Sequence, residues 1–151
     1  MDETMAALEQ LAPKQGVTLG ALGTDDLHLV LALAARCLPV GPPKTEREVN
    51  TLLQTWLAGT GAMLRIDHVE LRRTLIDFQL WERDGFGHAY RRVRSLANAE
   101  LARHAAALAD FNAERFVVTS RAQHAAARAL RKSTYGHAIK GMLPSPAPPQ
   151  P

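Results

Sequence analysis

Apolar residues recur with helical spacing in two segments of the first half of the chain. Residues 26–38 are apolar nearly all round, which predicts a helix at the centre of the core with Thr24 as its N-cap. Farther along, Thr45 and Glu48 form a capping box that predicts the start of a second helix. One apolar stripe continues from that box with helical spacing, and its members are Val49, Leu52, Leu53, Trp56 and Leu57.

A third amphipathic segment, residues 68–79, is followed directly by a hairpin pattern. Asp67 is expected to cap this helix, and Glu70 is expected to complete a second capping box. Its inward face is predicted to carry Leu71, Leu75 and Phe78, and its outward face Val69, Arg72, Arg73 and Ile76. Two strands, 81–84 and 89–93, are predicted on either side of a turn at 85–87.

This order of elements predicts a mainly α fold of the α+β class. It is a winged helix-turn-helix with a small β-hairpin wing, followed by alanine-rich C-terminal helices. We expect those helices at 96–114 and 120–132, the second capped by Thr119 or Ser120 and burying its alanines. Residues 62–66 are expected to form a short strand or a buried loop. The predicted parts of the chain are an N-terminal extension at 1–23 with a helix at 2–12, a winged-helix domain at 24–94, a helical extension at 95–140 and a disordered Pro-rich tail at 141–151.

Charge is distributed unevenly along the chain, although the formal net charge is only +3. Residues 1–50 carry seven acidic and four basic side chains, whereas residues 65–94 carry seven basic and five acidic ones. Residues 114–140 carry six basic side chains and one acidic side chain. Nucleic acid would be attracted to the last two regions, although a solvated surface without such a partner would show the same balance.

The remaining sequence patterns argue against several other classes of protein. Cys37 is the only cysteine and lies in an apolar run, which predicts a buried structural thiol and suits a cytoplasmic protein. The histidines do not cluster with cysteines or carboxylates, so we expect no metal site and no cofactor. The longest apolar stretch, 27–38, is far shorter than the roughly 20 residues that cross a bilayer, so we expect no membrane partner. The sequence has no phosphate-binding loop and no nucleophile elbow, so we expect neither an enzyme nor a small-molecule substrate.

The helix at 68–79 and the hairpin after it are the candidate contacts to nucleic acid. In a winged helix, the second helix of the helix-turn-helix lies in the major groove. Arginine on this helix would bind guanine or phosphate, and the hairpin would contact phosphate or the minor groove. The candidate residues are His68, Val69, Arg72, Arg73, Arg83, His88, Arg91, Arg92 and Arg94. A secondary basic surface on the C-terminal helices is expected to contain Arg121, Arg128, Arg131 and Lys132.

Other interpretations of these residues stay open at this point. Arg72 and Arg73 would instead form surface ion pairs if they paired with Asp77, Glu70 or Glu82. Such pairs are common and contribute only about 0–1 kcal/mol each. The apolar Val69 and Ile76 would either contact thymine methyl groups or be covered by another part of the protein. For Ile76 we favour a cover formed by the C-terminal alanine-rich helices.

An ordered series of short motifs resembles the bacterial domain of unknown function 2087. The motifs are Thr45-Glu46-Arg47-Glu48-Val49-Asn50, Asp67-His68-Val69-Glu70-Leu71-Arg72-Arg73, Ile76-Asp77, Leu80, Glu82-Arg83, Asp84-Gly85 and Tyr90-Arg91-Arg92. The resemblance covers about residues 26–93 and implies a winged-helix domain. Members of that family are often attached to ArsR-type helix-turn-helix regulators, which implies a role in transcription control.

Two functions from different classes follow. The first is a non-enzymatic, DNA-binding transcriptional regulator that binds double-stranded DNA through residues 68–79 and the hairpin. The second is a protein- or RNA-interaction module, in which the winged helix is a scaffold and the basic C-terminal helices form the contact surface. Residues 95–133 would provide the protein contact or a homodimer interface, as a symmetric operator would require.

Overall fold

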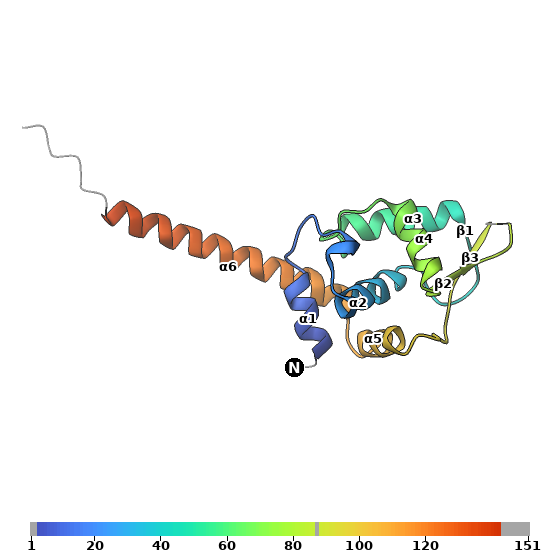
Figure 1. Ribbon diagram of the computed structural model, residues 1–151. Helices are drawn as coiled ribbons and strands as arrows, with labels where there is room; N and C mark the ends of the chain where they lie inside the picture. The colour runs from blue at the N-terminus through green and yellow to red at the C-terminus, as the bar shows by residue number, and fades with distance from the viewer. Residues whose placement is uncertain (1–2, 87, 143–151) are drawn as a thin grey trace, which may run out of the picture.

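The computed structural model describes residues 3–86 and 88–142. Its elements in chain order are α1 (Glu3–Leu11), the 3-10 helix η1 (Leu19–Ala21), α2 (Thr24–Ala35), β1 (Lys44–Thr45), α3 (Glu46–Ala58), α4 (His68–Asp77), β2 (Trp81–Arg83), β3 (Ala89–Arg92), α5 (Ala99–Ala109) and α6 (Ala113–Met142). The predicted mainly helical α+β class is confirmed. Figure 1 shows a body that contains α1 to α5 and the small sheet, with α6 leaving it on the side opposite the hairpin.

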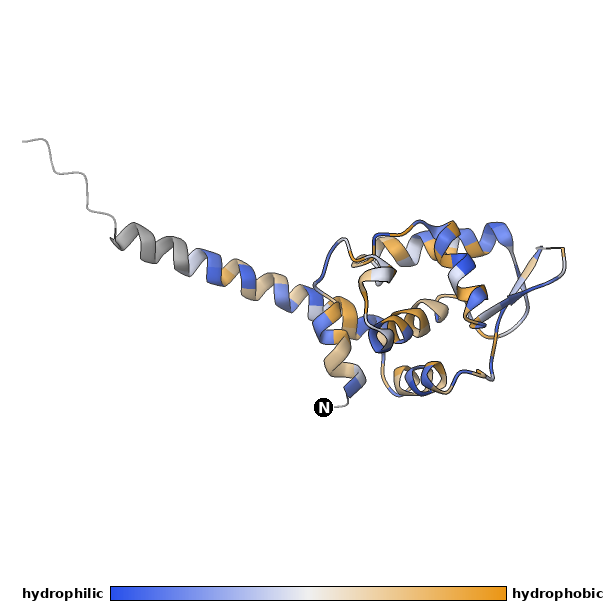
Figure 2. Cartoon of the chain, in the orientation of Figure 1, coloured by the Kyte–Doolittle hydropathy of each residue, from blue (hydrophilic) through white to orange (hydrophobic). Residues whose placement is uncertain are grey.

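Helix α2 forms the centre of the core, as its apolar sequence predicts. Residues 29–35 of this helix are all buried, and side chains from α1, α3, α4, the sheet, α5 and the start of α6 join the same buried cluster. Figure 2 colours most of α2 as hydrophobic, whereas the helices around it mix hydrophobic and polar colours. Trp81 of β2 lies in this core and donates a hydrogen bond of 3.0 Å from its Nε1 to the carbonyl of Ala35. The sheet is therefore attached directly to the central helix.

The predicted helix starts are confirmed at α3 and in part at α4. At α3 the Glu48 amide donates to the Thr45 hydroxyl over 3.2 Å, and the Thr45 amide donates to the Glu48 carboxylate over 3.2 Å. At α4 the Asp67 carboxylate accepts from the Glu70 amide over 2.7 Å, without the reciprocal bond among the described contacts. The expected Thr24 cap is wrong, because Thr24 is the first residue of α2 and Gly23, in extended conformation, precedes it without a side-chain cap.

The segment between α3 and α4 is a buried loop, one of the two predicted alternatives. Met63 and Leu64 are buried, and Leu64 forms an isolated parallel bridge with Val17. Gly61 is required here, because a Cβ at this position would lie 2.2 Å from the Trp56 ring. The loop therefore packs tightly on α3 and holds the start of α4 in place.

Three short strands form one antiparallel sheet in the order β1-β3-β2. The predicted hairpin is confirmed, whereas the two-residue strand β1 was not predicted. The register of the hairpin pairs Trp81 with Arg92, Glu82 with Arg91, and Arg83 with Tyr90. Directly paired residues project from the same face of a sheet, and successive residues alternate between faces. Arg83 and Tyr90 therefore share one face of the hairpin, and Glu82 and Arg91 share the other.

The two C-terminal helices exist, but the predicted break between them is wrong. The break lies at 110–112, because the Asn112 side chain accepts from the Arg115 amide over 3.1 Å and starts α6 there. Thr119 and Ser120 consequently lie inside α6 and cap nothing. The β-branched Val117, which suggested a break in the sequence, is instead buried in the core.

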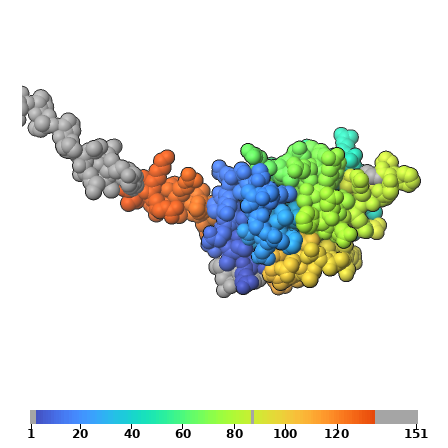
Figure 3. Space-filling view, in the orientation of Figure 1, coloured from blue at the N-terminus to red at the C-terminus, as the bar shows by residue number. Residues whose placement is uncertain are grey.

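The distal part of α6 does not bury its alanines, contrary to the prediction. Every residue from 122 to 134 is exposed, and Figure 3 shows this part standing clear of the body. The predicted tail at 141–151 begins within the last two residues of α6, and its residues 143–151 lie outside the described part of the chain.

Candidate nucleic-acid interface

Helix α4 is fixed to the body by its inward face. Leu71 and Leu75 are fully buried, and Phe78, just after the helix, is partly buried against the same core. The hairpin follows immediately and lies beside α4 at the end of the molecule (Figure 1). His68, at the first turn of α4, lies with its Nδ1 3.5 Å from the Gln54 amide nitrogen of α3. Part of the outward face of α4 and the adjacent face of the hairpin line a common groove.

Arg72 is held inside this region rather than presented to solvent. Its side chain is only 13% exposed and forms an ion pair of 3.1 Å with Glu46 of α3. The same guanidinium donates to the Asn50 side chain and lies 5.7 Å from the centroid of the Tyr90 ring. Pairing of Arg72 with a carboxylate was one of the predicted alternatives, but the partner comes from α3 and not from α4 or β2. Arg72 therefore connects α3, α4 and β3.

Arg73 and Arg83 are the exposed cations on the same side. Arg73 comes from α4 and Arg83 from β2, and neither guanidinium has a carboxylate within 4.0 Å in the described part of the chain. The two side chains line a groove of about 290 Å³ between the helix and the hairpin. The residues that line this groove are Arg72, Arg73, Ile76, Asp77, Arg83 and Tyr90. We call it the α4–hairpin groove.

The other predicted arginines of the hairpin lie in a second group. Arg91 is exposed and pairs with Glu82 at 3.9 Å, a surface contact of the kind that contributes about 0–1 kcal/mol. Arg92 is half-buried, and burial lowers the pKa of its guanidinium, with nearby Arg36 lowering it further. These two residues and Arg94 line a separate groove of about 410 Å³, which we call the outer groove. The predicted arginines are therefore divided between two grooves and do not form one patch.

The tip of the hairpin is organised by Asp84. Its carboxylate accepts from the His88 amide over 2.8 Å and from the Phe86 amide over 3.2 Å. These hydrogen bonds, the one from His88 first, hold the pKa of Asp84 below its ordinary value. The His88 ring stacks on Phe86 with a centroid distance of 6.3 Å, and the Phe86 side chain is 84% exposed.

Val69 and Ile76 are both partly exposed. The expected cover of Ile76 by the C-terminal helices is wrong, because α5 packs on α2 and α6 leaves the body at its far end. Ile76 instead packs against the edge of the core and lines the α4–hairpin groove.

The predicted secondary basic surface is also divided. Arg121 donates to three backbone carbonyls, those of Ala12 at 2.9 Å, Gly59 at 2.9 Å and Thr60 at 3.0 Å. Burial lowers the pKa of Arg121, and this side chain anchors α6 to α1 and to the loop after α3. Arg128, Arg131 and Lys132 are exposed on the part of α6 that projects from the body.

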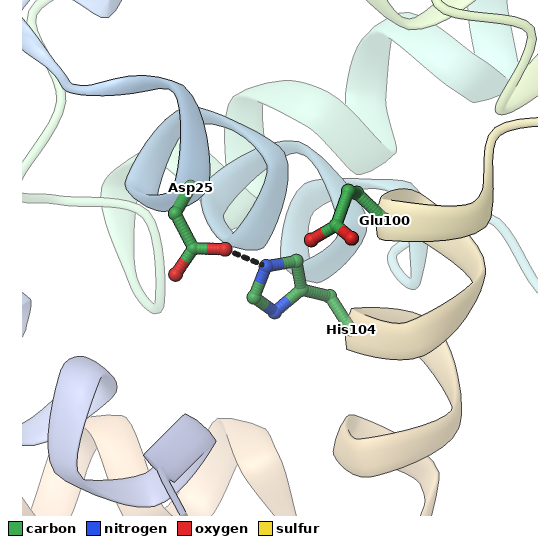
Figure 4. Close-up of side chains that lie close together, drawn as sticks. All are labelled: Asp25, Glu100 and His104. Atoms are coloured by element: carbon green, nitrogen blue, oxygen red, sulfur yellow. Dashed lines mark hydrogen bonds and ion pairs between the residues drawn. The ribbon is translucent and has the colours of Figure 1, made fainter.

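One cluster of titratable residues was not predicted. Asp25 of α2 accepts a contact of 2.9 Å from the buried His104 of α5, and Figure 4 shows Glu100 on the same helix face. The ligand atoms of these three residues lie within 4.8 Å of one another, so the expectation that no histidine clusters with carboxylates is wrong. Glu100 and His104 are one helical turn apart in the sequence, so their proximity could have been predicted. Asp25 is distant in the sequence, so its place beside them could not.

Arg103 forms ion pairs with both carboxylates of this cluster. Its guanidinium contacts Asp25 at 2.9 Å and Glu100 at 2.8 Å, so both carboxylates already have a cation beside them. The hydrogen bond from His104 is the largest cause that lowers the pKa of Asp25, and Arg103 adds to it. The cluster is therefore an ion-pair network that joins the start of α2 to α5.

Cys37 follows α2 and has the properties of a structural thiol, as predicted. It is partly buried, and burial raises the pKa of its thiol to about 12. The thiolate, which is the nucleophilic form, is therefore suppressed at neutral pH.

Comparisons with known proteins identify a family for the central part of the chain. Residues 24–92 match the model of a family described as "Uncharacterized protein conserved in bacteria (DUF2087)", which confirms the resemblance seen in the sequence for this segment. Searches of curated proteins and of solved structures found no match. Within the described residues, no helix is both long enough and apolar enough to cross a membrane.

Proposed function

We propose that residues 24–94 bind double-stranded DNA without catalysing a reaction, with α4 entering the major groove and the β2–β3 hairpin contacting the adjacent backbone. The observation that carries this proposal is the α4–hairpin groove, whose two exposed arginines, Arg73 and Arg83, have no carboxylate partner among the described residues. Unpaired guanidinium groups on neighbouring elements are suited to the phosphates of a duplex.

The arrangement of elements supports the same proposal. The chain order α2-β1-α3-α4-β2-β3 with the sheet order β1-β3-β2 is the arrangement expected of a winged helix. Arg72 supports this use of α4 indirectly, because its bonds to Glu46 and Asn50 fix α4 against α3. A reading helix must be held rigidly, since base recognition depends on the position of side chains in the groove.

A fluorescence anisotropy titration with a labelled duplex of mixed sequence tests the proposal. We expect binding at low salt that weakens steeply as salt is added, because phosphate contacts release counterions from DNA. Wild-type protein that does not bind the duplex at low salt would contradict the proposal. Transcriptional regulation follows only if binding is also selective for sequence, which the same titration with competitor duplexes measures.

A second function is favoured by one observation at the opposite end of the molecule. The exposed residues 122–134 of α6 carry Arg128, Arg131 and Lys132, and the sequence from 115 to 142 contains no acidic residue. A projecting basic helix is suited to an acidic protein surface or to RNA. The helix points away from the hairpin, so it would bind such a partner independently of the α4–hairpin groove (Figure 1).

Truncation after Arg121 separates the two functions. Deleting residues from 95 onward would remove the buried Leu101 and Leu108 and damage the core, so a shorter truncation that keeps Arg121 is the better variant. The DNA proposal expects the truncated protein to keep most of its affinity for duplex DNA. Loss of that affinity would show instead that the projecting part of α6 is the main nucleic-acid contact.

A further inference from the structure

We infer that the α4–hairpin groove is a binding site for a single phosphodiester group. The inference rests on the proposed function, since a DNA backbone supplies such groups, and it specifies the chemistry of that contact. The first support is the pair of cations at the groove. Arg73 and Arg83 approach it from two different elements, and both guanidinium groups are free of carboxylate partners within the described chain. Two convergent guanidinium groups are typical of phosphate recognition.

The second support is the hydroxyl group of Tyr90. Tyr90 lines the groove and is only 1% exposed, and its hydroxyl has no hydrogen-bond partner within the described structure. A buried polar group without a partner costs about 1–3 kcal/mol, so such groups are rare unless a ligand completes them. A phosphate oxygen is an acceptor, and the phenolic hydroxyl is a donor that a small adjustment of the groove would bring to it.

The third support is the balance of charge at the groove. Arg72 also lines it, but Glu46 at 3.1 Å already neutralises its charge. Arg73 and Arg83 together carry two positive charges, and Asp77 carries one negative charge on the same groove. The remaining single positive charge matches a phosphodiester, which is always a monoanion, better than free phosphate, which carries more than one negative charge on average at neutral pH. The groove therefore favours the DNA backbone over free phosphate.

Substitutions at the two grooves test the site in the full-length protein. Arg73→Ala and Arg83→Ala remove cations from the α4–hairpin groove, and Arg91→Ala and Arg94→Ala remove the same charge from the outer groove. Because both arginines contact the same phosphodiester, the double variant Arg73→Ala/Arg83→Ala is expected to reduce the slope of log affinity against log salt by about 0.9, and each single variant by no more than that. The outer-groove controls are expected to leave the slope unchanged. Equal effects of both pairs would overturn the inference.

Tyr90→Phe is the sharpest single variant. It removes only the hydroxyl that has no partner in the described structure, so the free energy of unfolding is expected to stay the same or rise. Affinity for the duplex is nevertheless expected to fall about tenfold to a hundredfold, which corresponds to one lost hydrogen bond to a charged acceptor. If the variant is as stable as the wild type and binds DNA equally well, the Tyr90 hydroxyl takes no part in binding and the inference is overturned.

A titration with dimethyl phosphate distinguishes failure of this inference from failure of the DNA proposal. Dimethyl phosphate is a monoanionic phosphodiester, and the ¹H-¹⁵N spectrum reports the Nε–H signals of Arg73 and Arg83. We expect both signals to shift with dimethyl phosphate, with weaker effects from inorganic phosphate at equal ionic strength. Shifts without DNA binding would reject only the proposed function. DNA binding with no response of these signals to dimethyl phosphate, or a stronger response to inorganic phosphate, would reject the phosphodiester site.

Discussion

Arginines lie on both faces of the β2–β3 hairpin, but their surroundings differ. On the face next to α4, Arg83 lies with Tyr90 and Arg73 around a groove, without a carboxylate within 4.0 Å of either guanidinium in the described structure. On the opposite face, Arg91 pairs with Glu82 across the register. A count of basic residues therefore does not distinguish the two faces. The availability of each cation depends on its neighbours.

The largest expected effect separates the buried part of the hairpin from its exposed part. Trp81→Ala removes a side chain that is 1% exposed and its hydrogen bond to Ala35, so we expect a loss of about 3–5 kcal/mol in the free energy of unfolding. Arg91→Ala on the exposed face is expected to change it by less than about 0.5 kcal/mol. Urea denaturation followed by circular dichroism measures both. Similar losses for the two variants would contradict a role of Trp81 in the core.

The second prediction compares neighbouring arginines on α4. Arg72→Ala removes the ion pair to Glu46 and the contact with the Tyr90 ring, and we expect a loss of about 1–2 kcal/mol in stability. Arg73→Ala, its matched control, is expected to cost less than about 0.5 kcal/mol while weakening DNA binding. Stability from urea denaturation and affinity from anisotropy should therefore separate the two variants. Two variants with the same profile would mean that Arg72 and Arg73 have the same role.

The third prediction concerns acidic residues on the two faces. Asp77→Asn removes the carboxylate of the α4–hairpin groove, and we expect affinity for duplex DNA to rise several-fold at low salt because a repulsion is removed. Glu82→Gln removes the same charge from a residue that lines the outer groove and is expected to change affinity less. Anisotropy titrations at matched ionic strength measure the difference. A larger gain from Glu82→Gln would place the DNA on the opposite face.

The smallest expected effect lies at the hairpin tip, where the two faces meet. The pKa of Asp84 is lowered from 3.8 by hydrogen bonds from backbone amides, the His88 amide first. A lowered carboxyl pKa means that the stabilisation is present above the ordinary value and is lost as pH falls through the lowered value. We expect the protection of the His88 amide from hydrogen exchange to decrease only in acid below pH 3.8. Asp84→Asn should show no such transition.

Features that depend on neighbouring residues were predictable from the sequence. The capping box of Thr45 and Glu48, the Asp67 cap and the hairpin all depend on residues within a few positions of one another. The start of α6 was missed although it is also local. The side chain of Asn112 caps that helix, whereas the β-branched residues near Val117, which suggested a break, are tolerated because the core buries them.

Features that depend on distant residues were not predictable. Arg72 pairs with Glu46 from another helix, and Arg121 donates to carbonyls of segments far away in the sequence. The face on which Arg83 lies depends on the register of the hairpin, and a slip by one residue would exchange it with the opposite face. The sequence therefore identified the candidate residues but not which of them share a surface.

The central claim is that the α4–hairpin groove, and not the outer groove, meets DNA. A ¹H-¹⁵N titration of the full-length protein with a short duplex tests it most directly, because arginine Nε–H signals from both grooves are followed in the same sample. We predict that the signals of Arg73 and Arg83 shift and broaden at substoichiometric DNA while those of Arg91 and Arg94 stay in place. Larger changes at Arg91 and Arg94 than at Arg73 and Arg83 would contradict the claim.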